Sequence, residues 1–218
     1  MLSLAHATTV LNNLGGVRNA ARTHGLRYHH VASSAGQSID LDVQNLTTYS
    51  PGFATPGRHG EFGVINLMPP SHDSAGVEFS EVELRFTFLV SGTEQSVVLP
   101  RTSLSFVDLD FGRTGGLGIE CVGWGSNAGI LAVLSPNTEL ASSSSPAGVA
   151  RVCGTTLSAT DDFEPQLADA ANLSNFARRR TVQLQIQNSS TFDLTLRLSC
   201  CRSYGHNFYF TGIPTPSC

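Results

Sequence analysis

Apolar and polar residues alternate in short runs along most of the chain, which is the period-two pattern of half-buried β-strands. The longest run covers residues 82–90, where every second side chain is apolar and those between are mainly charged or hydroxylated. Further strands are expected at residues 26–30, 39–43, 61–66, 95–99, 103–111, 119–124, 130–134, 149–157, 182–187, 192–200 and 208–210.

The segments between these runs contain residues typical of turns and loops. Ser91-Gly92-Thr93 predicts a hairpin between the strands that flank it. Residues 1–25 are expected to be loop-like, and the Ser-rich stretch 142–146 is expected to be a long turn. Residues 164–177 predict one short helix, because the stretch is rich in alanine and carries a proline in its first turn.

About ten short strands with so little helix indicate a single all-β domain over residues 1–218, an antiparallel β-sandwich of jelly-roll type. A parallel sheet would need helices between its strands, and the sequence offers one. Residues 1–25 form the N-terminal segment of this domain, and residues 202–218 form its C-terminal segment. A chain of 218 residues is long enough to bury a sizeable core.

The content of charged residues argues against several functional classes. Charged residues make up 14% of the chain and the net charge is -4, so no broad basic surface for nucleic acid is expected. All 13 cationic residues are arginines, which excludes Schiff-base lysines and a phosphate-binding-loop lysine. The run Arg178–Arg180 is expected to be an exposed helix-to-strand junction. No apolar stretch reaches the length of a membrane-spanning helix.

Asp108 and Asp110 end one expected strand, and strand alternation places both on the face of Leu104 and Phe106. Two like charges beside an apolar face are costly unless they are compensated. If this strand and the next form a hairpin, Glu120 returns beside Asp110. Calcium takes roughly six to eight oxygen ligands, so Asp108, Asp110 and Glu120 are the candidate calcium site. The alternative is a strand that runs out into water.

Asp40 and Asp42 form a second Asp-x-Asp pair with a different expectation. Ile39, Leu41 and Val43 make the apolar face of their strand. The two aspartates are therefore expected to lie on the solvent face.

Aromatic and polar side chains suggest a second kind of site, a sugar-binding face of the sandwich. Trp124 lies between two glycines, which suggests a loop that exposes its ring. The alternative is that the aromatic rings fill the core. The candidate ligand-binding residues are Trp124, Tyr204, His206, Asn207 and Tyr209, with Tyr49 as a further contributor.

Five cysteines leave at least one unpaired within the chain, and two bridges among five cysteines can be drawn about fifteen ways. Cys200 is expected to be a small core residue, and Cys201 and Cys218 are a possible pair. The disulfide candidates are Cys121, Cys153, Cys201 and Cys218. Glycosylation sequons occur at Asn45, Asn172 and Asn188, and they permit a secreted protein.

Eight short sequence phrases follow one another along the chain: Asn12–Gly16, Leu26–Tyr28, Gly36–Leu41, Tyr49–Pro51, Gly60–Asn66, Leu104–Asp110, Phe192–Leu196 and Gly205–Gly212. Together they resemble a β-sandwich domain of unknown function from predicted secreted or surface proteins of unicellular algae. The resemblance spans about residues 12–212 and implies an extracellular, lectin-like architecture without assigned catalytic residues.

Residues 1–6 lack the features of a signal peptide, which by itself predicts a cytosolic chain; a fragment or an incomplete gene model would also lack them.

The seven histidines accompany no metalloprotease, nucleophile-elbow or Cys/His signature. The sequence therefore favours a non-catalytic extracellular or cell-surface module, lectin-like and calcium-stabilised, whose partner is a glycan or another surface protein. One alternative is a carbohydrate-active hydrolase that uses Asp108, Asp110 or Glu120 as paired carboxylates. Another is a purely structural surface protein without a ligand.

Overall fold

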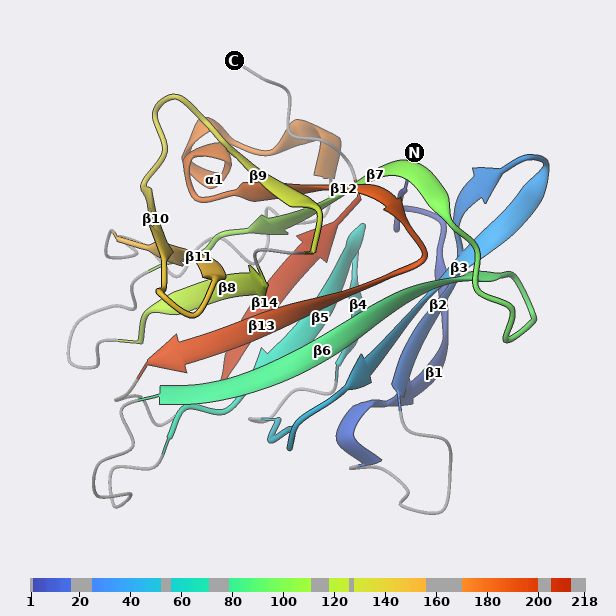
Figure 1. Ribbon diagram of the computed structural model, residues 1–218, viewed down its shortest axis with the longest axis horizontal. Helices are drawn as coiled ribbons and strands as arrows, with labels where there is room; N and C mark the ends of the chain where they lie inside the picture. The colour runs from blue at the N-terminus through green and yellow to red at the C-terminus, as the bar shows by residue number, and fades with distance from the viewer. Residues whose placement is uncertain are drawn as a thin grey trace.

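The computed structural model describes residues 2–16, 25–51, 56–70, 79–110, 118–125, 128–155, 170–199 and 205–212. These residues form two antiparallel sheets packed as a sandwich, which confirms the expected all-β fold (Figure 1). The larger sheet has eight strands in the order β1-β2-β3-β6-β13-β8-β11-β10. Their bounds are Thr8–Asn13 (β1), Gly25–Ser34 (β2), Gln37–Asn45 (β3), Phe79–Val90 (β6), Thr191–Ser199 (β13), Glu120–Gly125 (β8), Val149–Gly154 (β11) and Leu140–Ser144 (β10).

The smaller sheet has six strands in the order β4-β5-β14-β7-β12-β9. Their bounds are Gly57–His59 (β4), Phe62–Leu67 (β5), His206–Thr211 (β14), Leu99–Val107 (β7), Val182–Ser189 (β12) and Ile130–Leu134 (β9). Two single turns of 3-10 helix and one short α-helix complete the described structure. They are η1 (Leu14–Gly16), η3 (Ala170–Asn172) and α1 (Asn175–Arg179).

One apolar core lies between the sheets, and it follows from the alternation seen in the sequence. In the long pair β6–β13, Phe86 lies opposite Phe192 and Leu84 lies opposite Leu194, all pointing inward. The rings of Phe86 and Phe192 stack with centroids 5.2 Å apart, and Phe210 of the opposite sheet meets Phe86 edge-on at 5.9 Å. The two sheets therefore share one interior.

The chain changes sheet at almost every connection after β6. Because of this topology, the first expected hairpin forms only in part and the second does not form. After the turn at residues 91–93, pairing with β6 stops at a bridge between Leu89 and Ser96, and β7 then joins the other sheet. The second hairpin is wrong: β7 pairs with β12 and β14, whereas β8 pairs with β11 and β13.

Two expected loops are strands. Within the N-terminal 25 residues, β1 pairs with β2 at the edge of the larger sheet. The Ser-rich stretch 142–146 mostly belongs to β10, which pairs with β11 at the opposite edge. Edge strands contact one neighbour and bury few side chains, so their sequences show little alternation.

One short helix, α1 (Asn175–Arg179), overlaps the end of the helix predicted at 164–177 and extends beyond it, whereas residues 164–169 lie outside the described part of the chain. Ser174 caps the helix by accepting a hydrogen bond from the Ala177 N–H at 3.2 Å. Leu173 and Ala177 belong to a small second apolar cluster with residues of β5, β7 and β14. In the described residues no helix is long and apolar enough to cross a membrane.

Candidate functional site

Three side chains with metal-ligating atoms meet where the two sheets approach each other. Asp110 follows β7, Glu120 begins β8 and His206 begins β14. One ligand atom from each lies within 4.8 Å of the other two. We call these residues the acid–histidine cluster. Glu120 comes from the larger sheet and His206 from the smaller, so the cluster joins the two halves of the sandwich.

The backbone explains how the aspartates reach this position. β7 ends at Val107, and Asp108 adopts the left-handed conformation with φ 60°. The strand alternation that placed both aspartates beside Leu104 and Phe106 therefore stops before them. The Leu109 N–H then donates to the Arg180 carbonyl at 3.0 Å, and Leu109 itself is buried.

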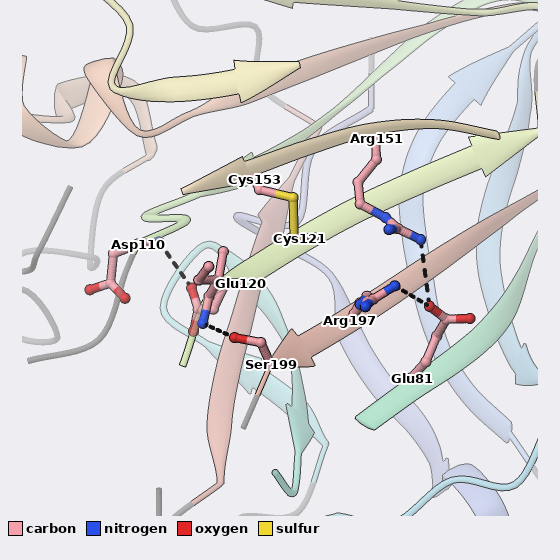
Figure 2. Close-up of a disulfide and its surroundings, with 9 residues drawn as sticks. Glu81, Asp110, Glu120, Cys121, Arg151, Cys153, Arg197 and Ser199 are labelled. Atoms are coloured by element: carbon pink, nitrogen blue, oxygen red, sulfur yellow. Dashed lines mark hydrogen bonds and ion pairs between the residues drawn. A yellow bond between two sulfur atoms is a disulfide. The ribbon is translucent and has the colours of Figure 1, made fainter. Parts of the chain in front are cut away.

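Glu120 does return beside Asp110, although the expected hairpin does not form. The Asp110 N–H donates to Glu120 Oε2 at 3.3 Å, and the Glu120 N–H donates to the Asp110 carbonyl at 3.1 Å (Figure 2). Gly154 makes this approach possible, because a Cβ there would lie 2.5 Å from the Asp110 carbonyl. The expected neighbourhood of Asp110 and Glu120 is thus present with a different chain path.

His206 completes the cluster, and sequence reasoning assigned it to the sugar-binding face. Its Nδ1 lies 2.8 Å from Glu120 Oε1. The two residues are 86 positions apart, and no local motif links them. β14 pairs with β5 and β7, and this pairing places the start of β14 at this end of the sandwich. The contact between His206 and Glu120 therefore follows from the tertiary structure.

Arg180 is a second residue whose place beside the cluster the sequence did not predict. It was expected at an exposed junction, but its side chain is only 2% exposed. Its Nε donates to Glu139 at 2.9 Å, and its Nη1 lies 3.8 Å from Asp108 and 4.0 Å from Asp110. Its guanidinium also stacks over the Phe176 ring at 4.0 Å. Packing of α1 against the smaller sheet buries the start of the segment that follows it.

The electrostatic balance around Asp108 is unfavourable to its charge. Burial raises the pKa of Asp108 to about 8, and the neighbouring Asp110 and Glu120 add to this rise, while Arg180 opposes it. Asp108 Oδ1 is buried and accepts no hydrogen bond from the described residues. The carboxylate is therefore held where a nearby cation would stabilise it.

A disulfide joins Cys121 and Cys153, which lie opposite each other in β8 and β11. The bridge is one residue from Glu120 and one residue from Gly154. Figure 2 shows it between the Asp110–Glu120 contact and a group of ion pairs made by Glu81 with two arginines. It therefore fixes the strands that position the cluster. Cys201 and Cys218 lie outside the described residues.

Three of the aromatic side chains expected at the sugar-binding face are buried. Trp124 lies in β8 and not in a loop, and it is buried on the same side as Val122 because that side of the strand faces the core. Tyr209 is buried in the second apolar cluster, and Tyr49 is buried with its hydroxyl donating to the Asn66 carbonyl. Tyr204 lies outside the described residues.

Asn207 remains half-buried beside the acid–histidine cluster. Its Oδ1 accepts a hydrogen bond from Asn66 Nδ2 at 2.8 Å, and its own Nδ2 donates to the Tyr209 hydroxyl at 3.2 Å. Of the predicted ligand-binding residues, the structure brings His206, Asn207 and Tyr209 together along β14.

The sequons differ in exposure. Asn172 and Asn188 are exposed. The Asn45 side chain is half-buried and hydrogen-bonded at both ends, accepting from the Gly15 N–H and donating to the Thr47 carbonyl. Attachment of a glycan at Asn45 would require these bonds to rearrange. Glycosylation remains a prediction at all three positions.

The second Asp-x-Asp pair was expected on the solvent face and is buried instead. Asp40 accepts hydrogen bonds from the backbone N–H groups of His30 and Gly92, and its Oδ2 lies 3.2 Å from His29 Nε2. Asp42 accepts from Arg27 Nε at 2.9 Å. Side chains of β2 and the turn after β6 cover this face, so alternation alone gave the wrong exposure.

Asp42 shares its arginine with a third acid. The Arg27 guanidinium also forms two hydrogen bonds to Glu94, at 2.7 and 2.9 Å. These contacts raise the pKa of Arg27 above its ordinary range, with the bond to Glu94 as the largest cause, and lower the pKa of Glu94. A network of hydrogen bonds and ion pairs therefore surrounds this pair.

Comparison with known proteins supports the fold. No protein-family model matches the chain, and no curated protein matches it significantly. The N-terminal domain of the Streptococcus gordonii adhesin Sgo0707 has a similar structure, with a TM-score of 0.52 and 11% identity over 95% of this chain and 48% of that chain. This chain therefore spans about half the length of that structure.

Two other solved structures are more distant. The adhesin domain of PrgB from Enterococcus faecalis, bound to DNA, has a TM-score of 0.48 and 10% identity over 86% of this chain and 66% of its own. Glucan Binding Protein C of Streptococcus mutans has a TM-score of 0.43 and 10% identity over 86% of this chain and 57% of its own. At this level of identity the first likeness shows that the chain has the same sandwich fold as an adhesin domain.

Proposed function

We propose that this protein is a non-catalytic binding module of an extracellular or cell-surface protein, with a surface glycan as its ligand. The observation that carries the proposal is the backbone likeness to an adhesin domain over 95% of the chain. A shared fold does not fix a function, so this support is analogy and the ligand needs a direct test. A surface protein as ligand is the other outcome of that test.

We further propose that a divalent cation stabilises the module at the acid–histidine cluster. Asp110 and Glu120 present carboxylates between the sheets, and Asp108 adds a third nearby. A cation there would link the start of β8 to the segment after β7. Its role is to hold the two sheets in register and so to position the loops at that end of the sandwich.

A carboxylate hydrolase is the second candidate, favoured by one observation. A carboxyl group with its pKa raised to about 8, as at Asp108, resembles the proton donor of a glycosidase. Two features weigh against catalysis. The Asp110 N–H and the Glu120 carboxylate are hydrogen-bonded to each other, so Glu120 is held by the protein's own backbone. Both Glu120 oxygens also have partners, in the Asp110 N–H and His206.

A glycan array probed with the labelled chain tests the binding function. We expect selective binding that persists in Asp110→Asn once the variant is shown to be folded, because the cluster supports the fold and does not contact ligand. Asp193→Asn is the matched control, since Asp193 pairs with Arg85 on the exposed face of the larger sheet. A blank array would refute the glycan, and a pull-down that retains a surface protein would replace it.

Hydrolysis of chromogenic glycosides separates the two candidates. The proposal predicts no turnover above the rate of heat-inactivated protein. Turnover that Asp110→Asn abolishes and Asp193→Asn leaves intact would establish the hydrolase instead.

A further inference from the structure

The acid–histidine cluster contains two chemical kinds of ligand atom. Asp110 and Glu120 offer carboxylate oxygens, and His206 offers an imidazole nitrogen. Calcium is coordinated by oxygens, whereas imidazole is a ligand of zinc and the other late first-row metals. We infer that Asp110, Glu120 and His206 form a site for a zinc-like transition-metal ion, an inference that rests on the cation site proposed above and names its ion class.

The distances suit such an ion. Tetrahedral zinc with bonds of about 2.0–2.2 Å keeps its ligand atoms about 3.3–3.5 Å apart. His206 Nδ1 and Glu120 Oε1 are 2.8 Å apart, and no pair of ligand atoms in the cluster exceeds 4.8 Å. Shifts of about one ångström in side-chain position would bring all three atoms to bonding distance.

The backbone around the ligands is fixed before any ion binds. The Glu120 N–H donates to the Asp110 carbonyl, and the Asp110 N–H donates to the Glu120 carboxylate. Gly154 packs directly on the Asp110 backbone, and the Cys121–Cys153 disulfide ties β8 to β11 (Figure 2). Preorganised ligands lose less freedom on binding, which favours affinity.

The charge balance around the cluster favours a doubly charged cation. Asp108 Oδ1 accepts no hydrogen bond from the described residues and lies 3.8 Å from Arg180 Nη1. The same arginine lies 4.0 Å from Asp110 and pairs with Glu139, which has a second cationic partner in Arg179 at 2.7 Å. Among the described residues, Arg180 therefore faces both aspartates, and a doubly charged ion next to Asp110 would offset the negative charge of the cluster.

The competing explanation needs no ion. A protonated His206 would form an ion pair with Glu120 at the observed 2.8 Å. This arrangement predicts that added metal has no effect on stability, whereas a metal site predicts stabilisation by mass action. The two explanations therefore differ in a measurable quantity.

The test uses the whole chain with free thiols alkylated, because thiolates also bind zinc. After treatment with a chelator and dialysis, thermal melting is followed with zinc chloride or calcium chloride, and cobalt(II) is titrated as a visible probe. We expect a rise in Tm at stoichiometric zinc and a cobalt absorption band that zinc displaces. His206→Gln should weaken the apparent affinity at least about 10-fold. The control His6→Gln, at an exposed position, should leave it unchanged.

Three results would overturn the inference. Zinc without effect on Tm and without displacement of cobalt would leave the His206–Glu120 ion pair as the explanation. An equal response in His206→Gln would place the ion elsewhere. Calcium that stabilises the wild-type chain and His206→Gln equally would establish an oxygen-only site, and the proposed cation site would survive with another ion.

A second measurement does not depend on the variant. In the wild-type chain with its free thiols alkylated, zinc should shift the imidazole resonances of a single histidine in NMR spectra, and shifts in none or in all seven would contradict the site. The glycan array is independent of these readouts, so failure of metal binding and failure of the proposed binding function can be told apart.

Discussion

The two Asp-x-Asp pairs, at residues 40–42 and 108–110, are both largely buried in the same sandwich, but their charges are balanced differently. Asp40 and Asp42 receive hydrogen bonds from backbone N–H groups and from Arg27 at 2.9–3.2 Å. Among the described residues, the ion-pair partner of Asp108 is Arg180, whose Nη1 lies 3.8 Å from Asp108 and 4.0 Å from Asp110.

Position in the sheet explains the difference. Asp40 and Asp42 lie within β3, and the neighbouring strand β2 brings Arg27 directly opposite Asp42. Asp108 and Asp110 follow the end of β7, where the chain crosses to the other sheet, so their partners come from distant segments. Within a strand the neighbouring strand supplies the compensating groups, whereas after a crossover the compensating groups depend on tertiary packing.

Replacement of the arginine beside each Asp-x-Asp pair should give the largest difference in stability between the two pairs. Arg180→Met should lower the free energy of unfolding by about 3–5 kcal/mol, because it leaves buried carboxylates without their cation. Arg27→Met should cost about 1–2 kcal/mol, because Asp42 keeps a hydrogen bond from Gln44 and Glu94 is exposed to solvent.

Chemical denaturation at pH 7 in the presence of a chelator gives both values. Equal losses in the two variants would show that the pairs are compensated alike. A neutral Arg180→Met would show that the carboxylates near it are already uncharged.

A smaller effect is expected from the backbone contact that positions Asp110. A Cβ at Gly154 would lie 2.5–2.7 Å from three Asp110 backbone atoms, so Gly154→Ala should cost about 1–3 kcal/mol. Gly125→Ala is the control, because nothing lies within 4 Å of a Cβ there. Gly154→Ala should also reduce any metal-induced rise in Tm, measured by differential scanning fluorimetry, and an unchanged response would separate Asp110 from the site.

Local patterns predicted most of the larger strands because one of their faces packs on the shared core. They failed for β1 and β10, where an edge strand needs little alternation. They also failed for the exposure of Asp40, because strand patterns describe a strand's own faces and not what neighbouring side chains cover.

The candidate site was predictable only in part. Asp110 and Glu120 are 10 residues apart and were expected to meet, and they do. His206 and Arg180 are distant in sequence from Asp110 and Glu120, and no local sequence motif predicts the contribution of either residue. Their contribution depends on the order of strands in two sheets, which a single sequence does not contain.

The last prediction concerns the pH dependence of stability and Asp108 alone. Its folded-state pKa of about 8 lies above the ordinary value of 3.8, so the folded chain holds this proton more tightly than the unfolded chain does. The stability from this group is complete below the ordinary pKa and is lost as pH rises through about 8. In chelator, wild-type Tm should therefore fall between pH 5 and pH 9 more steeply than the Tm of Asp108→Asn.

Asparagine suits this test for two reasons. It tolerates the left-handed backbone conformation at φ 60°, and it resembles the protonated acid in size. The variant should already be the more stable chain at pH 5, because pH 5 lies above the ordinary pKa of 3.8, and its advantage should grow until about pH 8. Asp40→Asn should instead destabilise across the whole range, because its carboxylate accepts two backbone N–H bonds. Parallel pH profiles for wild type and Asp108→Asn would mean that Arg180, despite its distance of 3.8 Å, compensates Asp108 as fully as β2 compensates Asp42.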